Sequence, residues 1–257
     1  MTLSHQKIMQ SIFHIFLLAS SLAVLTSCAE TVNRPNVVDR TQYVIVVVSG
    51  FDSDPSAEQI AGTAQRGSGN SGIFQLKGDL DAAGLECKFF NWNGTVAGQF
   101  GKNDPAGAAE IASWIEKRAA ETSNTEFIFL GHSWGAHTLF DVASQISDNS
   151  SIRVPFAVML DASSALRGAS PSKLPENIVT LVNYHTGNMF CWGPLKSERK
   201  VKNINLGEPT NGFMENGFPK YGSAFDISAH VSAEWDQKIH RDIYHRILAV
   251  VGEQSND

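Results

Sequence analysis

Short apolar runs at regular intervals along the chain constrain its fold more than any other feature of the sequence. Several of them consist almost entirely of β-branched and aromatic residues, which is typical of strands buried on both faces of a parallel sheet. The runs are Tyr43–Gly50, Leu85–Trp92, Glu126–Gly131, Val154–Leu160 and Asn177–Tyr184, with a weaker one at Lys200–Leu206. Such a sheet must be covered by helices on both faces.

Helical patterns lie between these runs. The first ends on Gly84, a common C-terminal cap, and the second begins with Pro105 after Asp104, a favourable N-terminal signal. The patterns cover residues 73–84, 105–121, 134–146 and 236–252. Strands that alternate with helices pair in parallel through right-handed crossovers. We therefore predict an α/β fold with a doubly wound, mostly parallel sheet flanked by helices, in one domain over residues 42–252.

Composition and charge support a globular protein and exclude one class of partner. The chain has 257 residues, of which 42% are hydrophobic and 18% charged, enough for one domain with a substantial core. The net charge is -6 at pH 7, and the one short basic segment, KSERKVK, is typical of a solvated loop. Without a basic face, we predict no nucleic-acid partner.

The N-terminal segment 1–27 is typical of a secretion signal. Its apolar run of fourteen residues is too short to span a membrane. The following Leu25-Thr26-Ser27-Cys28 resembles the lipobox of bacterial lipoproteins. The resemblance implies cleavage before Cys28, lipid attachment to that cysteine, a tether over residues 28–41 and a place in the bacterial cell envelope. Ala29 favours the outer membrane, because aspartate is associated with inner-membrane retention. The alternative is an ordinary signal peptide with an incidental cysteine.

Two further cysteines, Cys87 and Cys191, lie in the expected domain. In an oxidising envelope they form a disulfide or remain as buried thiols, and the sequence leaves both alternatives open. The chain shows no spacing of cysteine and histidine typical of a metal site, so we predict no metal.

The pentapeptide from Gly131 to Gly135, Gly-His-Ser-Trp-Gly, matches the pattern G-x-S-x-G. It follows a buried strand and opens a helix, and its two glycines permit close packing between them. The main-chain N–H of Trp134 then points toward whatever Ser133 attacks. This setting resembles the nucleophile elbow of the α/β-hydrolase superfamily, and GHSWGAH is similar to the motifs of lipases and esterases. The resemblance implies a nucleophilic Ser133, against the alternative of a structural turn.

In that superfamily the catalytic acid follows the serine along the chain. Asp161 comes directly after the run Val154–Leu160, at the carboxyl end of a predicted strand, where loops carry function in such sheets. We predict that Asp161 is the acid. A helix cap is its alternative role, and Glu198 and Asp226 are the substitute acids.

The resemblance also implies a histidine base near the C-terminus. His230 follows a long loop and precedes the last helical pattern, and we predict that it projects from a loop as the base. His240 and His185 are the alternatives.

The second donor of an oxyanion hole is expected in the loop after the first strand. Many relatives have His-Gly there, whereas this chain has Ser49-Gly50. We predict main-chain donors at Trp134 and Phe51, with Asp52 as the alternative to Phe51.

Together these residues predict a serine hydrolase that cleaves lipid esters or small acyl or aryl esters through an acyl-enzyme, without a cofactor. Thioesters and amides are less favoured substrates. The aromatic residues of the loop Gly207–Asp226 either line the substrate pocket or pin that loop to the domain. The alternative function is an inactive envelope lipoprotein that uses the fold for binding or scaffolding.

Overall fold

A computed structural model describes residues 41–253, except 93–106, 123, 164–170, 172, 197–199, 209, 211 and 214–226. The expected signal peptide, Cys28 and the tether up to residue 40 lie outside the described residues, as does most of the aromatic loop Gly207–Asp226. Among the helices of the described residues, none is long and apolar enough to cross a membrane.

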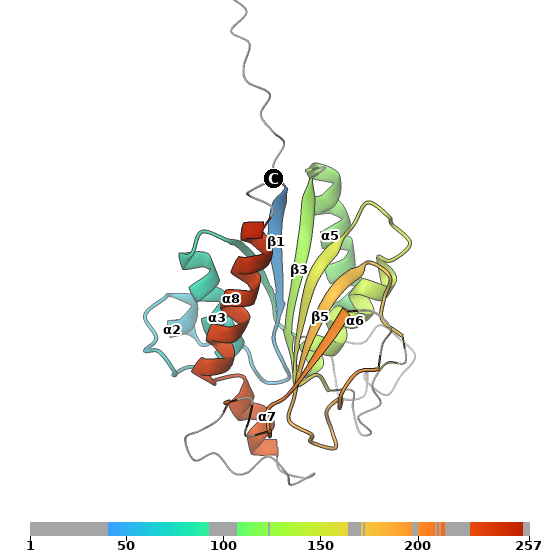
Figure 1. The fold of residues 1–257 in the computed structure, drawn as a ribbon. Coiled ribbons are helices and arrows are strands. Elements are labelled where there is room, and N and C mark those ends of the chain that lie inside the picture. The colour runs from blue at the N-terminus through green and yellow to red at the C-terminus, as the bar shows by residue number, and fades with distance from the viewer. Residues whose placement is uncertain are drawn as a thin grey trace, which may run out of the picture. The chain divides into compact units, whose positions relative to one another are not determined.

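Six strands form one sheet in the order β2-β1-β3-β4-β5-β6, and every neighbouring pair is parallel (Figure 1). The strands are β1 (Gln42–Val48), β2 (Glu86–Phe90), β3 (Thr125–His132), β4 (Val154–Leu160), β5 (Ile178–His185) and β6 (Lys200–Asn205). Because all six run the same way, their carboxyl ends lie along one edge of the sheet. This edge is where ligands bind in open α/β sheets.

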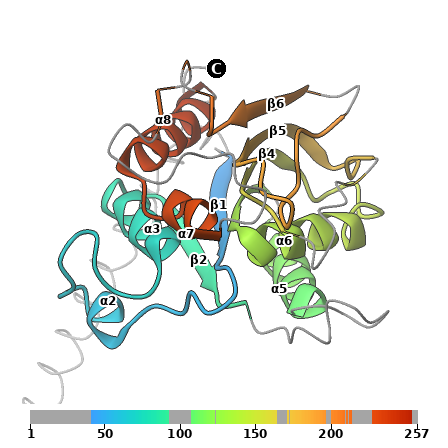
Figure 2. The ribbon, with the colours of Figure 1, turned by 90° about the horizontal axis from the view of Figure 1, so that it is seen from below.

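Helices cover both faces of the sheet (Figure 2). One face carries α3 (Gly72–Ala82) and α8 (Gln237–Glu253), and the other carries α5 (Ala108–Glu121) and α6 (Ser133–Gln145). In β1 the side chains of Val44, Val46 and Val48 pack with α5 and α6, whereas Ile45 and Val47 pack with α3 and α8. This alternation explains why the strand is apolar at every position, because neither of its faces meets water.

The α/β fold predicted from the sequence is confirmed, with all six strands present and parallel. Two short helices were not predicted: α2 (Ala57–Ile60), and α7 (Ile227–Ala233), which lies beyond the carboxyl ends of the strands in Figure 1. The prediction that His230 projects from a loop is wrong, since it lies in α7. Seven residues make fewer than two helical turns, too few for a periodic signal.

Candidate active site

Ser133 occupies a strained turn between the central strand β3 and helix α6. Its φ is 55°, in the left-handed region that residues other than glycine seldom adopt. The flanking glycines allow the turn. A Cβ at Gly131 would lie 2.6 Å from Cα of Ala136, and one at Gly135 would lie 2.1 Å from the carbonyl oxygen of Ser49. Both contacts are with backbone atoms, so only glycine permits this approach of helix to strand.

The structure brings Ser133, His230 and Asp161 together at the carboxyl edge of the sheet. Ser133 Oγ lies 2.7 Å from His230 Nε2, and His230 Nδ1 lies 2.7 Å from Asp161 Oδ2. All three residues are buried, at 5%, 8% and 0% exposure in that order. The alternative base His240 instead contacts the carbonyl oxygen of Glu234.

His185, the other alternative base, is buried at the end of β5, next to Thr186. Its pKa is lowered by burial, which outweighs the opposite effect of Asp161. The substitute acids Glu198 and Asp226 lie outside the described residues.

Asp161 is the first residue after β4 and also has a positive φ, 44°. Its Oδ1 accepts the main-chain N–H of Thr186 at 2.8 Å, and the Thr186 hydroxyl lies 2.9 Å from Oδ2. Burial alone would raise the pKa of Asp161, but hydrogen bonds from His230 and Thr186 outweigh it and hold this pKa below its usual value. The carboxylate is therefore ionised at neutral pH and orients the His230 ring.

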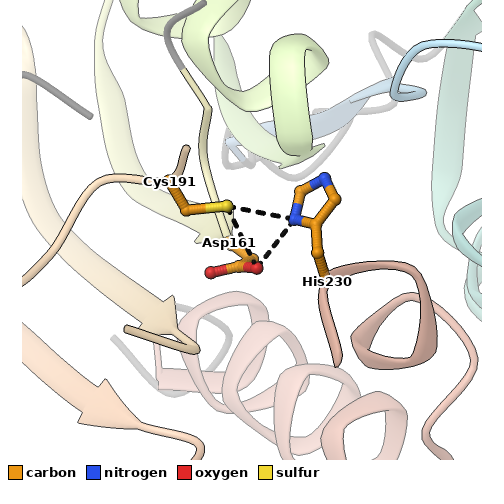
Figure 3. A group of neighbouring side chains, drawn as sticks. All are labelled: Asp161, Cys191 and His230. Carbon is orange, nitrogen blue, oxygen red and sulfur yellow. Dashed lines mark hydrogen bonds and ion pairs between the residues drawn. The ribbon is translucent and has the colours of Figure 1, made fainter. Parts of the chain in front are cut away.

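Cys191 joins this group, as Figure 3 shows. Its Sγ lies 3.3 Å from Asp161 Oδ2 and 3.2 Å from His230 Nδ1. The structure contains Cys87 and Cys191 as free thiols, so these two cysteines do not form the disulfide that the sequence left open. Burial and the neighbouring Asp161 carboxylate raise the pKa of the Cys191 thiol, which is therefore protonated and donates toward Asp161.

The same group also contains three atoms of the kinds that ligate metal ions, one each from Asp161, Cys191 and His230. Their spacing fits hydrogen bonds better. His230 Nδ1 and Asp161 Oδ2 are 2.7 Å apart, whereas two ligands in a tetrahedral zinc site are separated by about 3.3 Å. The sequence alone does not predict that Cys191 lies beside Asp161, because this position depends on a backbone bridge between Ser163 and Cys191. No local sequence pattern indicates that bridge.

A pocket of about 540 Å³ opens above Ser133. Most of its lining is apolar, from Phe51, Trp134, Phe190, Ile227, Val231 and Trp235. The rings of Phe51 and Trp134 are in contact, with centroids 5.3 Å apart, and Trp92 lies against both. The indole N–H of Trp134 donates to Ser163 Oγ at 3.1 Å, which fixes the ring at the pocket wall.

The loop after β1 passes close to Ser133. A Cβ at Gly50 would lie 3.0 Å from Ser133 Cβ, and Phe51 is the next residue along the chain. Trp134 is the second residue of α6, and an N–H in the first helical turn has no partner within the helix. Both predicted donors thus belong to segments that border the nucleophile, and their role remains a prediction.

Comparison with known proteins adds distant structural likenesses. No protein-family model and no curated protein matches the chain. A cutinase-like protein from Cryptococcus sp. is similar at 17% identity and a TM-score of 0.45, over 84% of this chain and 97% of that one. The catalytic core domain of acetyl xylan esterase from Trichoderma reesei is similar at 12% identity and a TM-score of 0.42, over 84% and 98%. These values are low, so the function is inferred from the site alone.

Proposed function

We propose that this protein is a serine esterase that cleaves carboxylic esters through an acyl-enzyme. The observation that carries the proposal is the pair of 2.7 Å contacts that link Ser133 Oγ to His230 and His230 to Asp161. A serine hydroxyl is a weak nucleophile until a base removes its proton, and the base needs an acid to orient it. The site contains each group within hydrogen-bonding distance of the next.

The mechanism follows from these contacts. Because Asp161 accepts the N–H at Nδ1 of His230, the lone pair at Nε2 faces Ser133 Oγ. His230 takes the hydroxyl proton as Oγ forms a bond to the ester carbonyl carbon, and Asp161 stabilises the resulting imidazolium. The imidazolium then gives the proton to the leaving alkoxide as the C–O bond breaks. Water, deprotonated by the same His230, releases the acid and restores Ser133.

The negative oxygen of the tetrahedral intermediate needs donors that are already in place. We assign this role to the main-chain N–H groups of Trp134 and Phe51, which border Ser133. One such donor lowers the barrier by about 3 kcal/mol, equivalent to about 100-fold in rate.

The pocket supports an ester with an apolar acyl or aryl group, because most of the surface that lines it near Ser133 is apolar. Lipid esters and small aryl esters both have this chemistry, and thioesters and amides are the lesser candidates. We further propose that Cys28 is lipidated and holds the enzyme at the bacterial envelope, as the lipobox-like sequence implies.

The test is turnover by the purified full-length protein on p-nitrophenyl esters of acetate, butyrate and octanoate, and on matched thioester and amide substrates. We expect Ser133→Ala to lower kcat by about 10³-fold or more. Ser144→Ala is the matched control, because Ser144 lies on the same helix and its hydroxyl contacts only the Phe140 carbonyl oxygen among the contacts described. It should leave kcat unchanged.

Labelling with a fluorophosphonate separates the esterase from an inactive binding protein. Wild type and Ser144→Ala should be labelled, and Ser133→Ala should not. Equal, negligible labelling of wild type and Ser133→Ala, together with no turnover, would favour the scaffold function.

A further inference from the structure

Glu234 is a buried carboxylate beside the site, in the turn that follows α7, and it is only 2% exposed. Its Oε2 accepts the hydroxyl of Ser53 at 2.7 Å. Its Oε1 accepts the hydroxyl of Ser71 at 3.1 Å and the main-chain N–H of Ile73 at 3.2 Å. Burying a carboxylate is costly unless donors surround it, and these three donors meet that need.

The donors come from two different segments. Ser53 lies in the loop after β1, two residues beyond Phe51, the proposed oxyanion donor. Ser71 and Ile73 lie at the N-terminus of α3, an eleven-residue helix packed on the sheet. The backbone of this helix also abuts Glu234, because a Cβ at Gly72 would lie 2.1 Å from the Glu234 carbonyl oxygen. Glu234 therefore ties its own segment to a rigid helix and to the oxyanion loop.

The segment that Glu234 ties down is the one that carries His230. Helix α7 has seven residues, and a helix so short depends on tertiary contacts for its position. Glu234 follows His230 by four residues, about one helical turn. The helix is thus fixed within one turn of the proposed base.

His132 lies between the same carboxylate and His230. Its Nδ1 lies 3.3 Å from Glu234 Oε2, and its Nε2–H donates to the carbonyl oxygen of His230 at 3.2 Å. The rings of His132 and His230 are stacked, with centroids 4.8 Å apart and planes 27° apart. Since His132 directly precedes Ser133, Glu234 borders segments that carry the proposed nucleophile, base and oxyanion donor.

We propose that Glu234 is a positioning residue, whose carboxylate holds the His230 segment and the Phe51 loop at a fixed separation around Ser133. This inference rests on the proposed esterase function. Glu234 acts through its hydrogen bonds and does not touch the reacting atoms. Misplacement of the base and the oxyanion donor slows the chemical step more than it weakens binding of the ester, so the effect belongs in kcat rather than KM.

The experiment compares two serines that each donate one hydroxyl to this carboxylate. Ser53→Ala breaks the link to the oxyanion loop. Ser71→Ala breaks a link to α3 but leaves Oε1 bonded to the Ile73 N–H, and it also removes the hydroxyl that caps α3 through Phe74. Ser71→Ala is therefore the control for lost stability without lost positioning.

We expect Ser53→Ala to lower kcat by about tenfold or more and to change KM by less than about threefold. The loss should be the same for acetate and octanoate esters, because a direct contact between Ser53 and the acyl group would instead depend on chain length. Ser71→Ala should keep kcat within about twofold while its melting temperature falls at least as far as that of Ser53→Ala. Glu234→Ala should lower kcat further, by about 100-fold.

Glu234→Ala leaves three buried donors without an acceptor, so Ser53→Ala is the decisive variant if the glutamate variant fails to fold. Wild-type kcat in Ser53→Ala overturns the inference. Equal losses of kcat in the two serine variants, in proportion to their melting temperatures, overturn it as well. Absence of turnover by wild type overturns the proposed function and this inference with it, whereas an active wild type with an unaffected Ser53→Ala overturns only the inference.

Discussion

Backbone strain at single residues is concentrated in the candidate site. Within the part of the chain that the structure describes, three residues other than glycine have positive φ, and they are Asp52, Ser133 and Asp161. Each such conformation costs about 1–3 kcal/mol, and it persists only where surrounding contacts enforce it. Here the three residues are the proposed nucleophile, its acid and the neighbour of the proposed oxyanion donor. The strained backbone conformations thus occur where the orientation of side chains matters for the chemistry.

Asp161→Asn tests the role of the acid without changing its size. An asparagine can donate its amide N–H to His230 Nδ1, which favours the tautomer with its proton on Nε2, where the lone pair is needed. We expect kcat for ester hydrolysis to fall by about 10³- to 10⁴-fold, while KM changes little.

Cys191→Ala is the matched control for that variant. It removes the thiol that approaches Asp161 Oδ2, and it leaves the carboxylate and its contacts with His230 and Thr186 in place. We expect its kcat to stay within about fivefold of wild type, because the hydrogen bond from His230 persists. An Asp161→Asn variant that keeps more than about a tenth of wild-type kcat would contradict the assignment.

Residues with a local signal could be found from the sequence, and residues without one could not. Ser133 lies in a recognisable strand–turn–helix motif, and Asp161 follows a strand directly, so position along the chain sufficed for both. Glu234 meets Ser53 across 181 residues, and Cys191 meets Asp161 across 30. Such contacts depend on how loops cross the sheet edge, which strand and helix patterns do not specify.

Among the elements, β1, β3, β4 and β5 were predictable because each contains a run of apolar residues, whereas β6 gave the weaker signal because four of its six residues are polar. The short helices were not predictable. Four residues in α2 and seven in α7 show no amphipathic period, and α7 is held by tertiary contacts rather than by its own sequence. That is the physical reason why His230 was assigned to a loop.

Two glycine substitutions test how tightly helix α6 must pack on the sheet. Gly135→Ala places a methyl group against the backbone of β1 and the loop after it, 2.1 Å from the Ser49 carbonyl oxygen. We expect the free energy of unfolding to fall by about 2 kcal/mol or more, and esterase activity to fall with it because the Ser133 turn is displaced. Urea unfolding followed by tryptophan fluorescence measures the first effect.

Gly78→Ala is the control, in the middle of helix α3. A Cβ there would meet nothing within 4 Å, so the substitution only improves helix propensity. The free energy of unfolding should rise by about 0.5–1 kcal/mol with kcat unchanged. If Gly135→Ala is as stable as wild type while Gly78→Ala behaves as expected, close packing does not maintain the elbow.

At the scale of the whole molecule, several histidines are buried in and around the site. His132, His185 and His240 are 3%, 7% and 1% exposed. Burial lowers the pKa of all three, and for His132 it outweighs the opposite effect of Glu234 at 3.3 Å. The folded protein therefore holds these rings neutral at pH values where the unfolded chain begins to protonate them.

This difference predicts acid-sensitive stability. An unfolded histidine has a pKa of about 6.5, so below that pH the unfolded state binds more protons than the folded state. The free energy of unfolding should be flat above about pH 7.5 and fall below about pH 6.5, by up to about 1.4 kcal/mol per pH unit for each histidine. Asp161, with its lowered pKa, adds its own loss only near and below the usual range of an aspartate.

Urea unfolding at pH 7.5, 6.5 and 5.5 measures this slope, and His240→Gln provides the control. Glutamine keeps an N–H donor for the Glu234 carbonyl oxygen but cannot take up a proton. The slope of the free energy of unfolding against pH should therefore become shallower by the contribution of one histidine. A free energy of unfolding that stays constant or rises from pH 7.5 to 5.5 would show that the buried rings are already charged in the fold.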